Sequence, residues 1–252
     1  MQIQDSTQKF SDRAADYHRY RPGYPNDVFE YLNAQYDWQA PPVVADIGAG
    51  TGLSSELFLK NGCTVFAIEP NEDMRNVARA QYGKFEEFQA IDGTASATKL
   101  DSNSVDLIFC AQAIHWFEPV ATKKEFERIL KPTGHIVVAW NYRENTSPFQ
   151  KSYEEMLHAR LTEYGQYGHR GLNKEVLQPF FHPRKISSLV FQHQQKFDLD
   201  SLKGRLLSAS YCPKSGKIYE AIMKDTEALF NQFQNQGKVT FDYTTNVFHT
   251  TN

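Results

Sequence analysis

The residues of this chain whose types and spacing are best suited to chemistry form the run Asp46-Ile47-Gly48-Ala49-Gly50-Thr51-Gly52, called the glycine loop below. The loop follows a short β-branched run and precedes a helix-like stretch, which is the context that a cofactor-binding loop needs. Glycines allow a tight turn and let a ligand approach where a Cβ atom would collide. The run therefore predicts a cofactor site at the end of the first strand.

Two carboxylates indicate which cofactor the glycine loop binds. Glu69 ends the second strand-like stretch, where it can accept hydrogen bonds from both hydroxyls of a ribose; a solvated charge is the alternative. The third glycine comes one residue earlier than in the dinucleotide fingerprint, and Asp46 would repel a pyrophosphate but attract an ammonium group. S-adenosylmethionine has a ribose, an α-ammonium group and no phosphate, so the charges favour it over NAD.

Alternating strand-like and helix-like stretches must position these side chains. Strands are predicted at residues 43–47, 63–68, 85–90, 105–110 and 135–140, and helices at residues 53–60, 71–80 and 121–130. Strands separated by helices predict βαβ crossovers and hence a mostly parallel sheet with helices on both faces.

The pattern changes after residue 140. Helices are predicted at residues 152–164 and 219–232, a polar loop at 141–148, and antiparallel strands near a sheet edge at 186–197 and 239–248. The sequence thus predicts an α/β, Rossmann-like, doubly wound fold. Its mostly parallel sheet has about seven strands, an antiparallel edge strand and a small helical cap.

The same pattern predicts four parts of the chain. We expect an N-terminal lid or arm at residues 1–35, a cofactor-binding core at 36–140, a cap insertion at 141–185, and a segment that completes the core sheet at 186–252. For residues 141–185, helical material that only fills the core is the alternative interpretation.

The composition is typical of a globular protein and argues against several partners. Hydrophobic residues make up 40% of the 252 residues and charged residues 23%. The net charge of −3 and the lack of a dense Lys/Arg run argue against nucleic acid. No signal pattern or membrane-spanning run is evident, and three separated cysteines predict reduced thiols without a metal site. We expect a cytoplasmic monomer or weak homodimer.

The glycine loop and three later runs resemble a known enzyme family. The segments ADIGAGTGLSSELF, VFAIEPNEDM, DGTASATKLDSNSVDLIFCAQAIHWF and RILKPTGHIVVAW are similar to class I S-adenosylmethionine-dependent methyltransferases. Within that superfamily they resemble the trans-aconitate methyltransferase-like and UbiE-like branch, methyltransferase type 11. The resemblance covers roughly residues 10–140 and implies S-adenosylmethionine as cofactor. The asparagine-proline-proline-tyrosine type motif of N6-adenine and glutamine methylating relatives is absent.

The resemblance also implies roles for single residues. Those at the cofactor are Asp46, Gly48, Ala49 and Gly50 at its methionine end, Glu69 at its ribose, Pro70, Met74, Thr94 and Ala95 at its adenine, and Gln112 beside its sulfonium. Related enzymes use the segment before the first strand as a lid. This assigns Tyr17 and Arg21 to the cofactor and Tyr20 to the acceptor, with an exposed arm as the alternative.

Two segments at the ends of later strands predict contacts with a methyl acceptor. His115 is the candidate general base if the acceptor is a hydroxyl or amine, whereas a carboxylate needs no base; a purely structural histidine is the alternative. Trp116 and Arg143 are candidate acceptor contacts, with packing and a solvated turn as their alternatives.

The predicted function is methyl transfer from S-adenosylmethionine to a small molecule, with a carboxylic acid as the first candidate. Arg19, Arg21 and Arg143 favour an acid, although the aromatic residues near His115 would suit a ring-bearing acceptor equally. Two alternatives stay open: a cofactor-binding protein without transfer activity, and an NAD-dependent oxidoreductase.

Overall fold

The computed structural model describes residues 13–162, 164 and 172–251, and predictions for residues 1–12, 163, 165–171 and 252 lie outside it. A seven-stranded sheet, ordered β3-β2-β1-β4-β5-β7-β6, forms its centre. The strands are β1 (Val43–Ile47), β2 (Thr64–Ile68), β3 (Phe88–Ile91), β4 (Val105–Ala111), β5 (Leu130–Arg143), β6 (Lys185–Phe197) and β7 (Val239–Thr251). The first five run parallel, and β7 pairs antiparallel with both β5 and β6. The predicted fold class is confirmed.

The strand order places a binding site at one edge of this sheet. From β1 the chain moves outward through β2 and β3, then returns to β4 on the other side of β1. The order therefore reverses between β1 and β4. Open α/β sheets bind ligands outside the carboxyl ends of the strands at such a reversal.

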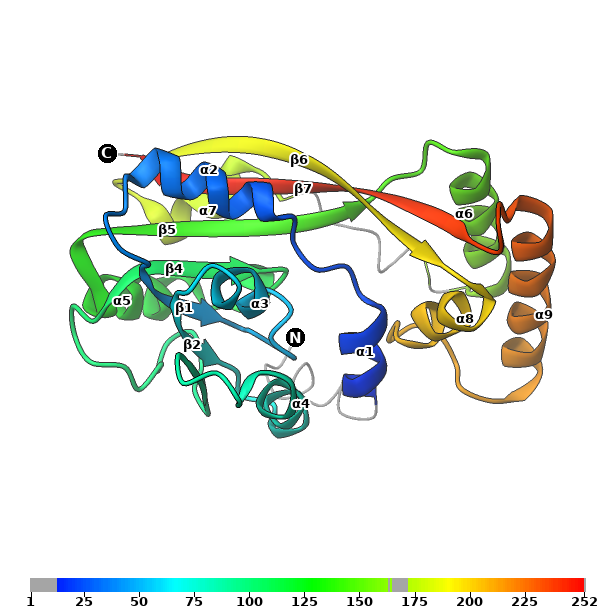
Figure 1. The fold of residues 1–252 in the computed structure, drawn as a ribbon, viewed down its shortest axis with the longest axis horizontal. Helices are drawn as coiled ribbons and strands as arrows, with labels where there is room; N and C mark the ends of the chain where they lie inside the picture. Colours follow the sequence, from blue (N-terminus) through cyan, green and yellow to red (C-terminus); the bar gives the residue numbers. More distant parts are fainter. Residues whose placement is uncertain (1–12, 163, 165–171, 252) are drawn as a thin grey trace.

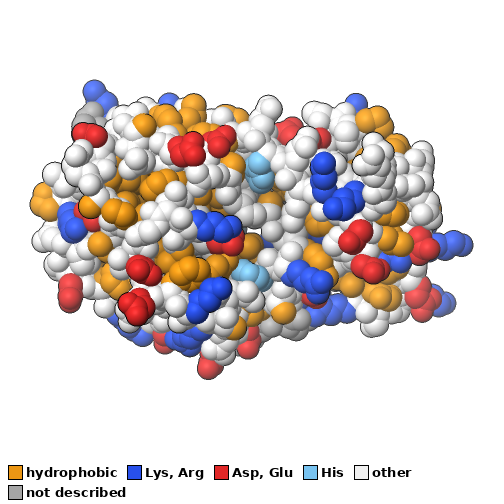
Figure 2. Space-filling model, viewed as in Figure 1, with side chains coloured by type: hydrophobic (Ala, Val, Ile, Leu, Met, Phe, Trp, Pro, Cys, Tyr) orange, Lys and Arg blue, Asp and Glu red, His pale blue; other side chains and the backbone are white. Residues whose placement is uncertain are grey.

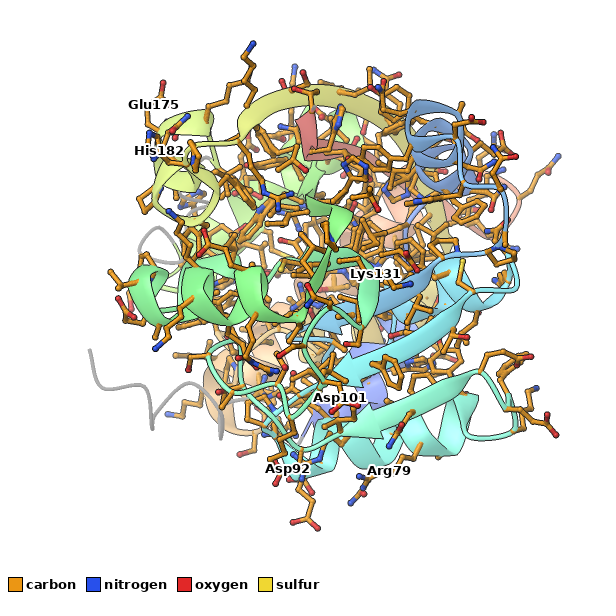
Figure 3. All side chains as sticks on the ribbon, turned by 90° about the vertical axis from the view of Figure 1, so that its left-hand side faces the viewer. Arg79, Asp92, Asp101, Lys131, Glu175 and His182 are labelled. Atoms are coloured by element: carbon orange, nitrogen blue, oxygen red, sulfur yellow. The ribbon has the colours of Figure 1, made fainter. Side chains whose placement is uncertain are left out.

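Helices cover both faces of the sheet (Figures 1 and 3). On one face, α2 (Asn26–Tyr36), α3 (Ser55–Leu59) and α4 (Glu72–Tyr82) contribute to one hydrophobic cluster with the strands. On the other face, α5 (Pro119–Ile129) and α7 (Lys174–Phe181) contribute to a second cluster. In the end view of Figure 3, the labelled Arg79 and Asp92 lie at the edge formed by α4 and β3. Burial on both faces explains the nearly continuous apolar sequence of the central strands.

A third cluster lies beyond the carboxyl ends of the parallel strands. It contains α6 (Pro148–Arg160), α8 (Leu199–Leu207), α9 (Gly216–Phe233) and the adjoining ends of β6 and β7, together called the helical end. The short α1 (Ala14–Tyr20) packs between α8 of this end and α4 of the core. Figure 2 shows the surface hollowed between the core and the helical end.

The structure differs from the sequence prediction at β5. Residues 141–143, predicted to begin a polar loop, continue the strand and pair with residues 243–245 of β7. Backbone pairing with β7 satisfies their peptide groups whatever the polarity of their side chains. Asn141 is nevertheless buried, and its amide donates to the Gly23 carbonyl at 3.0 Å.

Four helices were not predicted: α1, α2, α7 and α8. The segment 141–185 also divides in space, because α6 packs against α9 whereas α7 packs against α5. The helices α8 and α9 come from the segment expected to complete the sheet. The division of the chain into four parts therefore remains a prediction, with the helical end drawn from two of those parts.

Candidate active site

A cavity of about 520 Å³ lies between the carboxyl ends of the central strands and the helical end. This volume is typical of a site for a small ligand. The glycine loop, Glu69 and Met74 line one part of it, and Arg143, Glu154 and Arg205 line another. The cavity thus has a core part and a helical part, which can hold two chemically different ligands.

The glycine loop forms the floor of the core part. Gly48 and Gly50 both have left-handed backbone, with φ of 71° and 56°. A Cβ atom on Gly48 would lie 2.6 Å from the Cβ of Ala113, which no real structure accommodates without movement. A Cβ atom on Gly50 would meet nothing within 4 Å, because this residue faces the cavity. The loop therefore needs glycine at residue 48 and leaves room for a ligand at residue 50.

Glu69 is held in place by two backbone donors. The amide of Gly50 donates to its Oε2 at 2.9 Å, and the amide of Asn71 donates to its Oε1 at 2.8 Å. Burial raises the pKa of Glu69, while these two hydrogen bonds act in the opposite direction. Each carboxylate oxygen has more than one lone pair, so a ligand hydroxyl can still donate to it.

Asp46, the first residue of the glycine loop, lies in β1, is fully buried and does not line the cavity. The hydroxyls of Ser54 and Ser55 both donate to its Oδ2 at 2.7 Å, and its Oδ1 has no partner among the described residues. Burial raises the pKa of Asp46 to about 6. A buried carboxylate with one unpaired oxygen is the natural complement of a nearby cationic group.

The structure brings most of the predicted site residues to this cavity. Those that line it are Tyr17, Arg21, Gly48, Ala49, Gly50, Glu69, Pro70, Met74, Gln112, His115, Trp116 and Arg143. Tyr20, Asp46, Thr94 and Ala95 are not among the residues that line it. Ala95 is buried in a core cluster, while the ring of Tyr20 packs onto Gly204 of α8.

The loop after β4 also lines the cavity. Gln112 is a non-glycine residue with φ of 56°, a conformation that is uncommon and often found at functional sites. The side-chain amide of Gln112 donates from Nε2 to the Asn141 carbonyl at 2.8 Å. His115 lies in the short 3₁₀ helix Ile114–Trp116, with its ring 4.4 Å from the ring of Trp116 and 5.1 Å from that of Trp140. The imidazole is thus held against aromatic rings at the cavity wall.

Arg143 reaches the helical part, but its charge is already compensated. Its Nη2 donates to the carboxylate of Glu154 and, at 3.1 Å, to the hydroxyl of Tyr164. Its guanidinium also lies 4.9 Å from the ring centre of Tyr153. Arg143 is therefore part of a partly buried ion pair, which limits its capacity to bind an acceptor.

Sequence analysis did not single out several lining residues of the helical part, among them Glu154, Arg205 and Tyr243. Arg205 lies on the buried face of α8 with Leu202 and Leu206. A basic residue on the apolar stripe of a helix is the one signal in the sequence that could have identified it. Glu154 and Tyr243 carry no comparable signal, because only the fold brings them beside β5.

Comparisons with known proteins agree with this geometry. Residues 45–138 match a family described as "Methyltransferase domain". The chain is 32% identical over 149 residues to an uncharacterized methyltransferase of Schizosaccharomyces pombe, covering 59% of this chain and 58% of that protein. The matched region thus spans less than two thirds of that relative's length.

Solved structures show the same fold. A putative type II methyltransferase from Anaeromyxobacter dehalogenans has a TM-score of 0.64 and 19% identity, over 92% of this chain and 97% of that one. A phosphoethanolamine N-methyltransferase 2 from Haemonchus contortus, solved with phosphomonomethylethanolamine and S-adenosylhomocysteine, has a TM-score of 0.54 and 16% identity. That match covers 98% of this chain and 58% of the other.

The strand order and the glycine loop after β1 define a Rossmann-like α/β protein. Residues 45–138, which contain the glycine loop, match the methyltransferase-domain family, and over this region the chain is similar to class I S-adenosylmethionine-dependent methyltransferases of the type 11 branch. The resemblance found in the sequence is confirmed. Among the described residues, no helix has the length and apolar character needed to cross a membrane.

Proposed function

We propose that this protein transfers a methyl group from S-adenosylmethionine to a small molecule, with a carboxylic acid as the first candidate. The observation that carries the proposal is the position of Glu69 beside the open side of Gly50 in a cavity that continues into a second, differently charged part. A ribose hydroxyl fits Glu69, and the unpaired oxygen of Asp46 fits a cation near the loop.

The cofactor would supply a methyl group that its sulfonium has already activated. The residues of the chain would then have two tasks, which are to align the acceptor and to exclude water. Alignment alone can contribute on the order of 7–11 kcal/mol to lowering the barrier. Tyr17 and Arg21 of the arm line the cavity on the side of the helical end, where they would help to exclude water.

The need for a base depends on the acceptor. A carboxylate is ionised at neutral pH and reacts without losing a proton, whereas a hydroxyl or an amine must lose one. His115 is the candidate to accept that proton, because it lines the cavity. The arginines of the helical part support an acid, and the rings beside His115 suit a ring-bearing acceptor.

Two experiments test this proposal. Calorimetry with S-adenosylmethionine, S-adenosylhomocysteine and NAD should show binding of the two sulfur nucleosides and none of NAD; tight NAD binding alone would overturn it. The protein is then incubated with methyl-labelled S-adenosylmethionine and metabolite extracts. Label in a small acidic product supports the proposal, whereas cofactor binding with no labelled product would indicate a binding protein without transfer activity.

We further propose that the protein works in the cytoplasm as a monomer or weak homodimer. Cys63, Cys110 and Cys212 are all free and buried, which suits a reducing compartment. Size-exclusion chromatography with light scattering would test the oligomeric state.

A further inference from the structure

The helical part of the cavity is lined by three arginines: the partly buried Arg21 and Arg143 and the buried Arg205. Arg205 is 6% exposed, and the side chain of Arg143 is 10% exposed. Within the described lining of this part, Glu154 is the carboxylate that faces them, and it is paired with Arg143. The positive charge of this part therefore exceeds its negative charge.

The three groups differ in how their hydrogen-bonding capacity is used. Arg21 donates from Nε to the hydroxyl of Ser208 at 3.2 Å and from Nη2 to the Ser208 carbonyl at 3.3 Å. Arg143 donates to Glu154 and Tyr164. In contrast, Nε and Nη1 of Arg205 are buried and have no hydrogen-bond partner in the described part of the chain.

Burial opposes the charge of Arg205, whereas the neighbouring Tyr243, Tyr211 and Tyr153 raise the pKa of its guanidinium. Two of its donors still lack a partner among the described residues, and such donors are costly to bury. Burial, followed by the like charge of Arg205, lowers the pKa of Arg21, and both side chains line the cavity. The charge of Arg205 also opposes that of Arg143, although burial is the larger opposing effect and Tyr153, Tyr164 and Tyr211 raise the pKa of Arg143 overall. An anion bound between these groups would balance their like charges.

We infer that Arg205 binds an oxyanion of the methyl acceptor, a carboxylate or a phosphate, and so sets acceptor specificity. This inference rests on the proposed function. The anionic group sits at the helical part, and the atom to be methylated lies toward the glycine loop. Arg205 is held rigidly on α8 between Leu202 and Leu206, so its planar fork fixes the orientation of the acceptor as well as its charge.

Calorimetry of the protein loaded with S-adenosylhomocysteine tests the inference. The probes are succinate, inorganic phosphate and uncharged succinamide. Succinate or phosphate should bind to the wild type and succinamide should not; the stronger anion distinguishes a carboxylate from a phosphate site. Arg205→Met should weaken the binding of that anion about tenfold to a hundredfold, as expected for a lost charge-assisted contact. Arg205→Lys should retain part of it.

The matched control is Arg160→Met, which removes a guanidinium from α6 that is 45% exposed and paired with Asp225. It should leave anion binding unchanged. Arg205→Met should bind S-adenosylhomocysteine with an affinity within about twofold of that of the wild type. This result would show that the variant is folded and that the core part of its cavity is intact. Unchanged anion binding in Arg205→Met, or no anion binding by the wild type, would overturn the inference.

The titrations are repeated without S-adenosylhomocysteine. The wild type could bind the anions but not S-adenosylhomocysteine, and Arg205→Met could lose the anion binding. In that case the proposed function is wrong and the anion site stands. If the wild type binds S-adenosylhomocysteine but none of the anions, the inference about Arg205 is wrong and the cofactor part of the proposed function stands.

Discussion

At the scale of single residues, the two carboxylates at the ends of β1 and β2 occupy different environments. Glu69 accepts two backbone hydrogen bonds and faces the cavity, whereas Asp46 is fully buried and accepts two serine hydroxyls. Glu69 can therefore contact a ligand directly. Asp46 would act through the field that its charge creates.

Replacing Glu69 tests the predicted ribose contact. Glu69→Gln exchanges a charged acceptor for a neutral amide, and hydrogen bonds to charged groups contribute about 1.5–3 kcal/mol. We expect the affinity for S-adenosylhomocysteine, measured by calorimetry, to fall about tenfold to a hundredfold. Glu56→Gln, on the outer side of α3, is the control. Equal affinities of wild type and Glu69→Gln would mean that the ribose lies elsewhere.

His115 and Arg21 distinguish the two classes of acceptor. If the acceptor is an acid, Arg21→Ala should raise its KM while His115→Ala leaves kcat nearly unchanged, because an ionised carboxylate needs no base. Steady-state kinetics with the acceptor found by methyl labelling measure both KM and kcat. Loss of turnover in His115→Ala with normal kinetics in Arg21→Ala would instead indicate a hydroxyl or amine acceptor. Arg143→Ala is less informative, because it also removes the ion-pair partner of Glu154.

At the scale of elements, the N-terminal arm is attached to α8. Arg13 donates to the carbonyls of Leu207, Ala209 and Cys212, and Arg21 donates to Ser208. The arm also presents Tyr17 and Arg21 to the cavity. These contacts connect the position of the arm to the helical end, so that a ligand between them would stabilise both.

We predict that the arm becomes more ordered when the cofactor binds. Hydrogen exchange of residues 17–24 should slow on addition of S-adenosylhomocysteine, because lids that shield a reactive centre close over their ligand. Amides of β4, which are buried in the sheet with or without ligand, serve as the reference. Equal protection of the arm in both states would identify it as a fixed structural piece.

At the scale of the whole molecule, a cluster of histidine and tyrosine side chains joins α2 to the sheet. The rings of His135 and Tyr36 are stacked, with centroids 3.6 Å apart and an interplanar angle of 8°. His249 lies within hydrogen-bond distance of the hydroxyls of Tyr31, at 3.0 Å, and Tyr36, at 3.3 Å. Burial, with the charge of Arg184, lowers the pKa of His135 to about 4.

This cluster predicts a loss of stability in acid. A histidine titrates near 6.5 in the unfolded chain and His135 near 4 in the folded one, so the unfolded chain binds more protons between these values. The free energy of unfolding should therefore fall as the pH falls from 6.5 toward 4. His135→Phe keeps a ring against Tyr36 and should reduce that fall by about 1–2 kcal/mol.

Urea denaturation at a series of pH values measures this effect. The control is His182→Gln, because His182 is exposed and lies at the outer end of α7 (Figure 3). Identical pH profiles for wild type and His135→Phe would show that protonation of His135 does not oppose folding.

Much of the core could be predicted from the sequence because its determinants are local. The apolar runs of β1, β2 and β4, buried on both faces, identify the parallel strands. The glycine loop needs backbone conformations that glycine adopts most readily, and Asn71 caps α4 as expected, with its side chain accepting from the amide of Met74. Such features depend on a few neighbouring residues, so they are visible in the sequence itself.

The helical part of the cavity depends on contacts between residues that are distant in the chain. Arg143 is neutralised by Glu154 of α6, and Arg205 reaches the cavity because α8 packs beside the arm. The spacing of residues in the sequence identifies neither the pairing of Arg143 with Glu154 nor the position of Arg205, because charge compensation depends on which side chains the fold places together. The sequence by itself determined the fold class and the likeness to methyltransferases. Only the tertiary structure decided which arginine keeps unused donors in the cavity, because burial and pairing are properties of the folded chain.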